Sequence, residues 1–380
     1  MSHVIRFDRL RDDGTVISRR SVLALPLAAA ACSRQRTAFQ GYAFIANQEG
    51  GAIAAVDLEV FAVAKHIPLN SAPSQVLAAT ERPSVYALTP DSGTVHEIDA
   101  SQLRLARKLP VAARAAGMTM SEDERFLYVL GREPRSIHAI ALDSFRLAWK
   151  APLPDEPVDL AVSASGEHAA ISMASGVRLI NLTTRQVNRP LGGAGDFGTL
   201  RFLADGKTLI VADRGERRLS LYDVESARLI THLPVAVRPH YLCFNKDGGQ
   251  LFVTGEGLDA VVVVYPYRTP QVAETVLAGR APGAMAASTQ FLMVASPLSG
   301  DVSILNIPTR KVIAVVQVGT DPGFVAVTPD DQYALVLNRA SGDVSVLRLG
   351  TLTPNRYKMA GLLTVIPVGS KPVSAAVRAI

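Results

Sequence analysis

The stretch that decides the fold is Tyr333-Ala-Leu-Val-Leu-Asn-Arg-Ala-Ser-Gly-Asp-Val-Ser-Val-Leu-Arg-Leu349. An apolar run ends at Asn338, the turn residues Ser341-Gly342-Asp343 follow, and an alternating run begins at Val344. β-Branched and aliphatic residues favour a pleated, half-buried strand, and glycine supplies the backbone freedom that a tight reversal needs. The stretch therefore predicts a β-hairpin, and residues 291–307 repeat it in nearly the same order.

Similar units recur along the whole chain after residue 42. Successive copies are 40–43 residues apart and begin near eight positions: Tyr42, Val85, Leu127, His168, Leu209, Leu251, Phe291 and Tyr333. The fifth copy contains four short strand-like runs, at 209–213, 219–224, 229–235 and 241–244. The alternation has period two, and no stretch keeps a helical period. A regular repeat of this length is typical of β-propeller blades, each a four-stranded antiparallel sheet.

We therefore predict an all-β protein with a single β-propeller over residues 42–380. The run that comes fourth in a copy, such as 241–244, occurs eight times along the chain, and this favours eight blades. These runs are 75–79, 117–120, 159–162, 199–203, 241–244, 284–287, 324–327 and 374–378. In such a ring this strand is the innermost one of the next blade, so 374–378 should pair with the strand that begins at Tyr42 and close the ring. Seven blades are the alternative if the degenerate copy 168–208 folds irregularly. In the last copy we expect a longer loop at 355–361 and a third strand from Leu363.

The units resemble the YVTN-type β-propeller repeat of exported bacterial proteins. The matching stretches are Leu127-Tyr-Val-Leu, Leu251-Phe-Val-Thr, Ser92-Gly-Thr-Val-His-Glu-Ile-Asp99, Ile313-Ala-Val-Val-Gln-Val-Gly319 and Pro322-Gly-Phe-Val-Ala-Val-Thr-Pro-Asp330. The resemblance covers residues 42–380. It implies the propeller fold and says little about function, because such repeats serve many roles.

Residues 1–32 have the pattern of an export signal. Ser18-Arg19-Arg20-Ser21-Val22-Leu23 precedes the short apolar run 24–31 and then Cys32. The paired arginines resemble a twin-arginine signal, with Val22 where that motif usually has Phe. The small residues before Cys32 resemble a lipobox, although the leucine lies five residues before the cysteine instead of three. Either Cys32 is lipidated or the signal is simply cleaved after an Ala-x-Ala site, and 33–41 is a linker. We expect a periplasmic or cell-surface location, with contact to a membrane only through a lipid anchor.

Composition limits the remaining classes of partner and site. The net charge of +5 over 380 residues comes without a dense Lys/Arg run, so we expect no nucleic-acid partner. The only cysteines are Cys32 and Cys243, which leaves no metal-type spacing, and Cys243 within Tyr241-Leu-Cys-Phe244 is expected in the core. We expect no metal site and no resident cofactor.

Ligands of propellers are expected at the mouth of the central channel, where loops enter the innermost strands. Aligned on the proline of Arg238-Pro239-His240, the ring of residues before it is Ala72, Arg114, Glu156, Asp196, Arg238, Ala281, Asp321 and Lys371. The ring after it is Ser74, Ala116, Val158, Gly198, His240, Gly283, Gly323 and Val373. The basic members could hold an anion and the acidic ones a cation or amine. The alternative is that these charges are solvated and pair with neighbours. The small residues of the second ring are expected to leave room for a ligand.

His240 is the one acid–base candidate in this ring. Catalysis usually needs a second group to orient such a histidine, and Asp196 or Glu156 with Arg238 is the best available. The other histidines after the leader (His66, His96, His138, His168 and His232) are not expected to share one structural position. Gly192-Gly193-Ala194-Gly195 lies between strands with no helix after it, which argues against a dinucleotide site. We therefore assign no catalytic residue.

Three functions remain open at the level of sequence. The favoured one is an exported, non-enzymatic binding or scaffold protein that acts on another protein or a cell-envelope ligand through its loops and channel mouth. The second is a lactonase-like hydrolase, since some sugar-lactone hydrolases use similar propellers. The third is a periplasmic cofactor-binding or redox-associated propeller, which the lack of repeated histidines disfavours.

Overall fold

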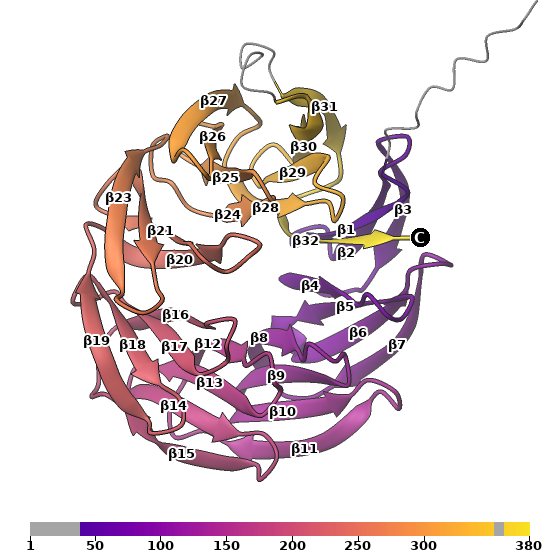
Figure 1. Ribbon diagram of the computed structural model, residues 1–380. Helices are drawn as coiled ribbons and strands as arrows, with labels where there is room; N and C mark the ends of the chain where they lie inside the picture. Colours follow the sequence, from indigo (N-terminus) through magenta and orange to yellow (C-terminus); the bar gives the residue numbers. More distant parts are fainter. Residues whose placement is uncertain (1–38, 353–360) are drawn as a thin grey trace, which may run out of the picture. The chain divides into compact units, whose positions relative to one another are not determined.

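The computed structural model describes residues 39–352 and 361–380, and these fold into eight four-stranded antiparallel sheets arranged around a centre (Figure 1). We number the sheets as blades in chain order. From the innermost strand outwards, blade 1 is β32 (Pro372–Ala379), β1 (Gly41–Asn47), β2 (Ala52–Asp57) and β3 (Ala62–Pro68). Blade 2 is β4 (Gln75–Ala78), β5 (Ser84–Thr89), β6 (Thr94–Asp99) and β7 (Arg104–Pro110). Blade 3 is β8 (Arg114–Met120), β9 (Phe126–Glu133), β10 (Arg135–Ala141) and β11 (Arg146–Pro152). Blade 4 is β12 (Pro157–Val162), β13 (His168–Met173), β14 (Gly176–Asn181) and β15 (Gln186–Leu191).

The second half of the ring repeats this order. Blade 5 is β16 (Phe197–Phe202), β17 (Thr208–Asp213), β18 (Arg218–Asp223) and β19 (Arg228–Pro234). Blade 6 is β20 (Arg238–Phe244), β21 (Leu251–Glu256), β22 (Ala260–Tyr265) and β23 (Gln271–Leu277). Blade 7 is β24 (Met285–Ala287), β25 (Phe291–Ser296), β26 (Asp301–Asn306) and β27 (Lys311–Gln317). Blade 8 is β28 (Pro322–Val327), β29 (Tyr333–Asn338), β30 (Asp343–Arg348) and β31 (Leu362–Pro367). Two short 3₁₀ turns, Pro90–Ser92 and Leu349–Thr351, interrupt the pattern.

The predictions of eight blades and of closure by the C-terminal strand are confirmed. β32 pairs antiparallel with β1 from Gly41↔Ala379 to Asn47↔Pro372, so the last strand completes the first sheet. The degenerate copy 168–208 forms a regular blade, which excludes the seven-bladed alternative. Phe39 is buried and β1 begins at Gly41, while the leader, Cys32 and residues 33–38 of the expected linker lie outside the described residues. So does most of the loop expected at 355–361.

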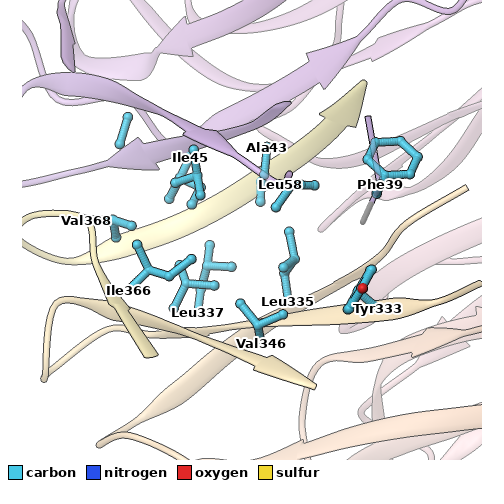
Figure 2. Packing of buried hydrophobic residues seen from close by; sticks show 14 residues of the cluster. Phe39, Ala43, Ile45, Leu58, Tyr333, Leu335, Leu337, Val346, Ile366 and Val368 are labelled. Carbon is cyan, nitrogen blue, oxygen red and sulfur yellow. The ribbon is translucent and has the colours of Figure 1, made fainter. Parts of the chain in front are cut away.

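The predicted hairpin 333–349 forms β29 and β30 of blade 8, and one face of it packs against blade 1. All six residues of β29 are buried, because this strand is covered on both faces by its neighbours. Leu335 and Leu337 of β29 meet Ile45 of β1 in one apolar cluster that also contains Phe39 (Figure 2). Full burial of each leucine stabilises the fold by about 1.5–3 kcal/mol. Ordinary core packing therefore holds the first and last blades together.

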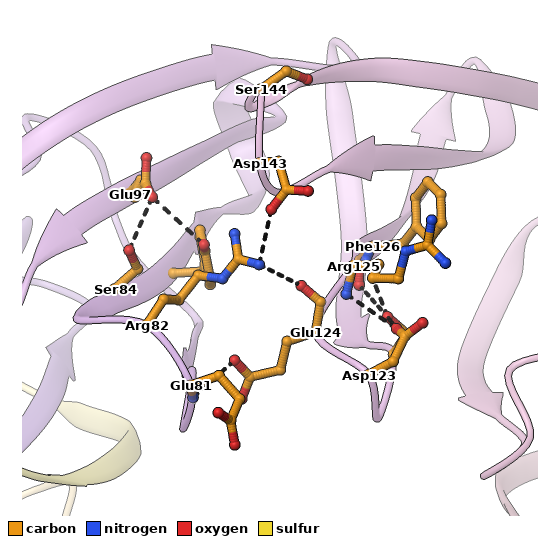
Figure 3. A network of polar contacts seen from close by, with 12 residues as sticks. Glu81, Arg82, Ser84, Glu97, Asp123, Glu124, Arg125, Phe126, Asp143 and Ser144 are labelled. Carbon is orange, nitrogen blue, oxygen red and sulfur yellow. Dashed lines mark hydrogen bonds and ion pairs between the residues drawn. The ribbon is translucent and has the colours of Figure 1, made fainter.

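Polar latches also join neighbouring blades at the turns that lead out of the innermost strands. The carboxylate of Glu124 accepts hydrogen bonds from the backbone and hydroxyl of Thr80 (2.6 Å for the hydroxyl) and from the backbone of Glu81 at 3.1 Å. Arg82 reaches the Glu124 carbonyl at 3.1 Å and Asp143 at 3.0 Å (Figure 3). These bonds connect blades 2 and 3 on the side of the ring opposite the channel mouth described below.

Candidate functional site

The predicted mouth residues all lie at the starts of the innermost strands, at one end of the channel. Arg114 and Arg238 are the first residues of β8 and β20, and Asp196 comes directly before β16. Because the innermost strands follow the same order in every blade, their starts meet at the same face of the ring (Figure 1). The structure therefore gathers these residues into a ring, as the alignment of the units predicts.

Each charged member of this ring has an oppositely charged neighbour. The pairs are Arg114–Glu133 (3.4 Å), Glu156–Arg132 (3.3 Å), Asp321–Arg339 (2.6 Å), Lys371–Glu49 (3.5 Å), Arg238–Asp196 (2.6 Å) and Arg214–Asp196. Exposed pairs of this kind contribute only about 0–1 kcal/mol each. Their consequence is electrostatic, since the mouth presents fixed pairs and no surplus of one sign.

Asp196 is the most strongly held of these carboxylates. Its burial alone would raise its pKa, but hydrogen bonds from Arg238 and Arg214 outweigh that effect and hold the pKa below its ordinary value. Arg238 belongs to blade 6, so the pair also ties blade 5 to blade 6. A carboxylate with a lowered pKa and two guanidinium partners is a poor general base.

His240 lies beside this cluster and is exposed in the mouth. Its ring stands edge-on to Tyr241 with centroids 4.6 Å apart, and its carbonyl accepts the hydroxyl of Thr199 at 2.7 Å. The surrounding protein and, secondarily, Arg214 lower the pKa of His240, so its ring is neutral at pH 7. Within the described part of the chain no carboxylate bonds to this ring, and neither Asp196 nor Glu156 orients it.

The small residues of the second ring are covered by the protein's own side chains. The position that a Cβ of Gly198 would take is 3.2 Å from the side chain of Arg214, and that of Gly283 is 3.4 Å from the ring of Tyr241. Arg339 fills the corresponding space at Gly323. The room expected there for a ligand is therefore occupied, and the glycines allow neighbouring side chains to lie flat across the mouth.

The expectation that the remaining histidines share no structural position is wrong for His96 and His138. The strand register places His96 of β6 and His138 of β10 at equivalent positions in the third strands of blades 2 and 3, opposite Lys108 and Lys150. Both imidazoles are buried inside their blades and do not reach the channel mouth. No group of three or more His, Cys, Asp or Glu side chains that could hold a metal ion occurs among the described residues.

A recess opens beside the mouth, in blade 6. Counted from the innermost strand, the second and third strands of the other seven blades pair over six or seven positions. In blade 6 these strands are β21 and β22, and they pair over only three, from Leu251↔Val264 to Val253↔Val262. The tip beyond them, residues 254–261, splays apart. The resulting recess has a volume of about 750 Å³, within the range of small-molecule sites.

Two hydrogen-bonded anchors hold the recess open. The Thr254 hydroxyl of β21 donates to the carbonyl of Gly283 in blade 7 at 2.7 Å. On the other side, the Asp259 carboxylate accepts the backbone N–H of Ala281 at 2.8 Å. Gly255 cannot be replaced without movement, because a Cβ there would lie 1.8 Å from the carbonyl oxygen of Arg238.

Sequence reasoning located one edge of this recess and missed the rest. The lining residues are His240, Tyr241, Gly255, Glu256, Gly257, Leu258, Asp259, Leu277, Ala281, Pro282, Gly283 and Pro297. His240, Ala281 and Gly283 belong to the predicted rings. The available signal for the remainder was the tip sequence Gly255-Glu-Gly-Leu-Asp259, which departs from the Ser-Gly-Asp turns of blades 7 and 8.

Two other hollows are smaller than this recess. One of about 320 Å³ is bordered by Gly192–Asp196, which lies in the turn between β15 and β16 as the sequence predicts. Another of about 450 Å³ lies at the far ends of the innermost strands, next to the Arg201–Asp159 pair. In the described residues, no helix is long and apolar enough to cross a bilayer.

Comparison with known proteins gives structural matches only. No family model and no curated protein matches the sequence, so the resemblance to YVTN-type repeats stays a prediction. The structure aligns with dihydro-heme d1 dehydrogenase NirN in complex with DHE, with a TM-score of 0.75 and 13% identity over 88% of this chain and 75% of that chain. It aligns with apo AztD from Citrobacter koseri with a TM-score of 0.67 and 14% identity, over 89% of this chain and 98% of that chain. A hydrazine synthase chain from Kuenenia stuttgartiensis aligns with a TM-score of 0.57 and 17% identity, over 73% of this chain and 95% of that one. At these identities the matches show the propeller fold, and their different roles show that the fold does not determine function.

Proposed function

We propose that this protein is an exported, non-enzymatic binding protein that takes its ligand in the blade 6 recess at the channel mouth. The observation that carries the proposal is the splayed tip of β21 and β22, which occurs in one blade of eight and opens a 750 Å³ recess beside the mouth. A regular propeller blade gains nothing in stability from losing half of a strand pairing, so the departure is best explained by a ligand.

The chemistry of the mouth supports binding over catalysis. The carboxylates nearest His240 are bound to arginines, and among the described residues no hydrogen bond joins its ring to a second acid–base group. A hydrolase of the lactonase type needs a base and an orienting group held together.

The experiment is a thermal-unfolding screen of the full chain against divalent metals, haem, sugar lactones, aromatic amines and cell-wall fragments. A ligand that binds only the folded state raises the melting temperature by mass action, by a few degrees at saturating concentration. Leu277→Trp fills the recess from an exposed position, and Val60→Trp makes the same kind of change in the β2–β3 turn. We expect a stabilising ligand whose effect is lost in Leu277→Trp and kept in Val60→Trp.

Three results would contradict the proposal, two from this screen and one from a separate assay of lactone hydrolysis. A ligand shift that Leu277→Trp leaves unchanged would place binding elsewhere. Turnover of a lactone that His240→Ala abolishes would make the protein an enzyme. A haem shift that depends on the recess would instead favour the cofactor-binding alternative.

Export and tethering are proposed from the leader alone. Replacing both Arg19 and Arg20 by Lys should keep the protein in the cytoplasm if the twin-arginine resemblance is meaningful. Cys32→Ser should move the exported protein from the membrane fraction to the soluble fraction if Cys32 carries a lipid. An unchanged distribution in both variants would contradict this part of the proposal.

A further inference from the structure

Most of the residues that line the blade 6 recess are apolar. Tyr241, Leu258 and Leu277 line it with 38%, 37% and 71% of their surface exposed, although side chains of this size are usually covered. Pro282 and Pro297 add further rigid apolar surface. Exposed apolar side chains that gather in a concave site mark a place where another apolar body is bound.

The polar groups of the recess carry negative charge. Glu256 and Asp259 both line it, and none of the described lining residues is a lysine or arginine. Asp259 uses one carboxylate oxygen on the backbone of Ala281 and leaves the other without a described partner. The side chain of Glu256 is 78% exposed, and its contact with Arg238 is long, at 3.5 Å. Arg238 makes its shorter contact, 2.6 Å, with Asp196, so Glu256 is weakly held.

Besides Arg238, which contacts Glu256, a second cation lies close to the rim of the recess. A guanidinium nitrogen of Arg217 is 3.1 Å from the position that a Cβ of Gly257 would take. Arg217 lies in the turn between β17 and β18 and does not line the recess. Its charge opposes that of Glu256, which makes its removal a useful test.

We propose that the recess selects an organic cation, meaning a molecule with a flat or aliphatic apolar body and an ammonium or amidinium group placed at the carboxylates of Glu256 and Asp259. This inference rests on the proposed binding function and adds the ligand class. The apolar body packs on Tyr241 and Leu277, and the cation is attracted to the two carboxylates at the solvent-exposed edge of the recess. The neutral His240 ring does not compete with the ligand's charge.

The test uses three environment-sensitive dyes titrated into the full chain by fluorescence: berberine as a cation, N-phenyl-1-naphthylamine as a neutral molecule and anilinonaphthalene sulfonate as an anion. We expect berberine to bind most tightly and Leu277→Trp to abolish its binding. Glu256→Gln with Asp259→Asn should weaken berberine about tenfold, because two partly exposed ion pairs are lost while Asn keeps the oxygen that accepts the Ala281 N–H. Glu225→Gln, in the β18–β19 turn, removes one carboxylate away from the recess and should change nothing.

A second variant keeps the test decisive if the double change disturbs folding. Arg217→Gln should strengthen berberine binding and leave the neutral dye unchanged. If the neutral or anionic dye binds best and still depends on Leu277, the cation class is refuted while the binding function stands. If no dye responds to Leu277→Trp, this inference is refuted, and the ligand screen above decides the binding function separately. If berberine responds to Leu277→Trp but not to either charge variant, the carboxylates have no role in selection and the inference is likewise refuted.

Discussion

His96 should make the stability of the propeller depend on pH. Its imidazole is buried in β6, where Nε2 bonds to the Thr89 hydroxyl at 3.0 Å and Nδ1 has no partner in the described structure. Burial, with a smaller contribution from Lys108, lowers the pKa of His96 from 6.5 to about 4. The folded protein therefore holds this ring in its neutral form.

The magnitude follows from the difference in proton binding between the two states. At about 1.36 kcal/mol per pKa unit, a fall from 6.5 to about 4 corresponds to about 3 kcal/mol. Between these two pH values the unfolded chain binds a proton at His96 and the folded chain does not, so stability rises with pH. The contribution is complete above pH 6.5 and is lost as the pH falls towards 4, with about 2.5 kcal/mol lost between pH 7.5 and 4.5.

The assay is urea unfolding at pH 7.5 and 4.5, followed by the fluorescence of Trp149, which packs on Tyr128 within blade 3. His96→Gln keeps a polar group of similar size without the titration, so its free energy of unfolding should fall about 2.5 kcal/mol less than that of the parent over the same interval. An NMR titration of the His96 ring should give a midpoint near pH 4. His66→Gln, on the exposed face of β3, is the matched control and should behave like the parent.

Equal losses of stability in His96→Gln and the parent would refute this reasoning. A His96 midpoint near 6.5 in the folded protein would refute it as well, because it would mean that burial does not penalise the charged ring.

Three further predictions test the closure of the ring, the contact between Asp331 of blade 8 and Thr289 of blade 7, and the half-buried thiol of Cys243. Deleting residues 368–380 removes β32 and its pairing with β1, so the sharp unfolding transition should be lost; a truncated chain that unfolds as cooperatively as the parent would contradict the closure. Asp331 adopts a left-handed backbone (φ 58°) and accepts two hydrogen bonds from Thr289, at 3.0 and 2.5 Å. In urea unfolding, Asp331→Ala should therefore lower the free energy of unfolding by about 2–3 kcal/mol, and Asp331→Gly should lower it by about 1 kcal/mol less because glycine relieves the backbone strain. Equal losses in the two variants would argue against backbone strain. Burial raises the pKa of Cys243 to about 11, so in a Cys32→Ser background the native protein should resist iodoacetamide at pH 8 and react after unfolding; rapid alkylation of the native protein would contradict the burial.

The repeat and its closure were readable from sequence because they depend on local patterns. The apolar run that ends at Asn338 and the alternating run from Val344 form β29 and β30 within the predicted limits. The predicted closing strand, 374–378, lies in β32 and pairs with β1. A strand's period of two and the glycine of its turn are properties of neighbouring residues, so one sequence suffices to detect them.

The pairing of the mouth charges depended on the assembled ring. Asp196 and Arg238 are 42 residues apart, and their contact exists because blades 5 and 6 lie side by side. The sequence shows which residues of the mouth are charged. It does not show how they pair, because the partners are determined by which innermost strands begin next to each other in neighbouring blades. For the same reason the ring of Tyr241 covers Gly283, where the sequence predicts open space.

By itself, the sequence of this protein determined an all-β ring of eight copies, the strand that closes it and the end of the channel where the copies differ. The tertiary structure alone decided that blade 6 splays at residues 254–261 and that the resulting recess is lined by carboxylates and leucines. The physical reason is that strand formation follows from local alternation of side chains. A recess arises instead from a few missing backbone pairs and from contacts such as Thr254 with Gly283, which form only between neighbouring blades.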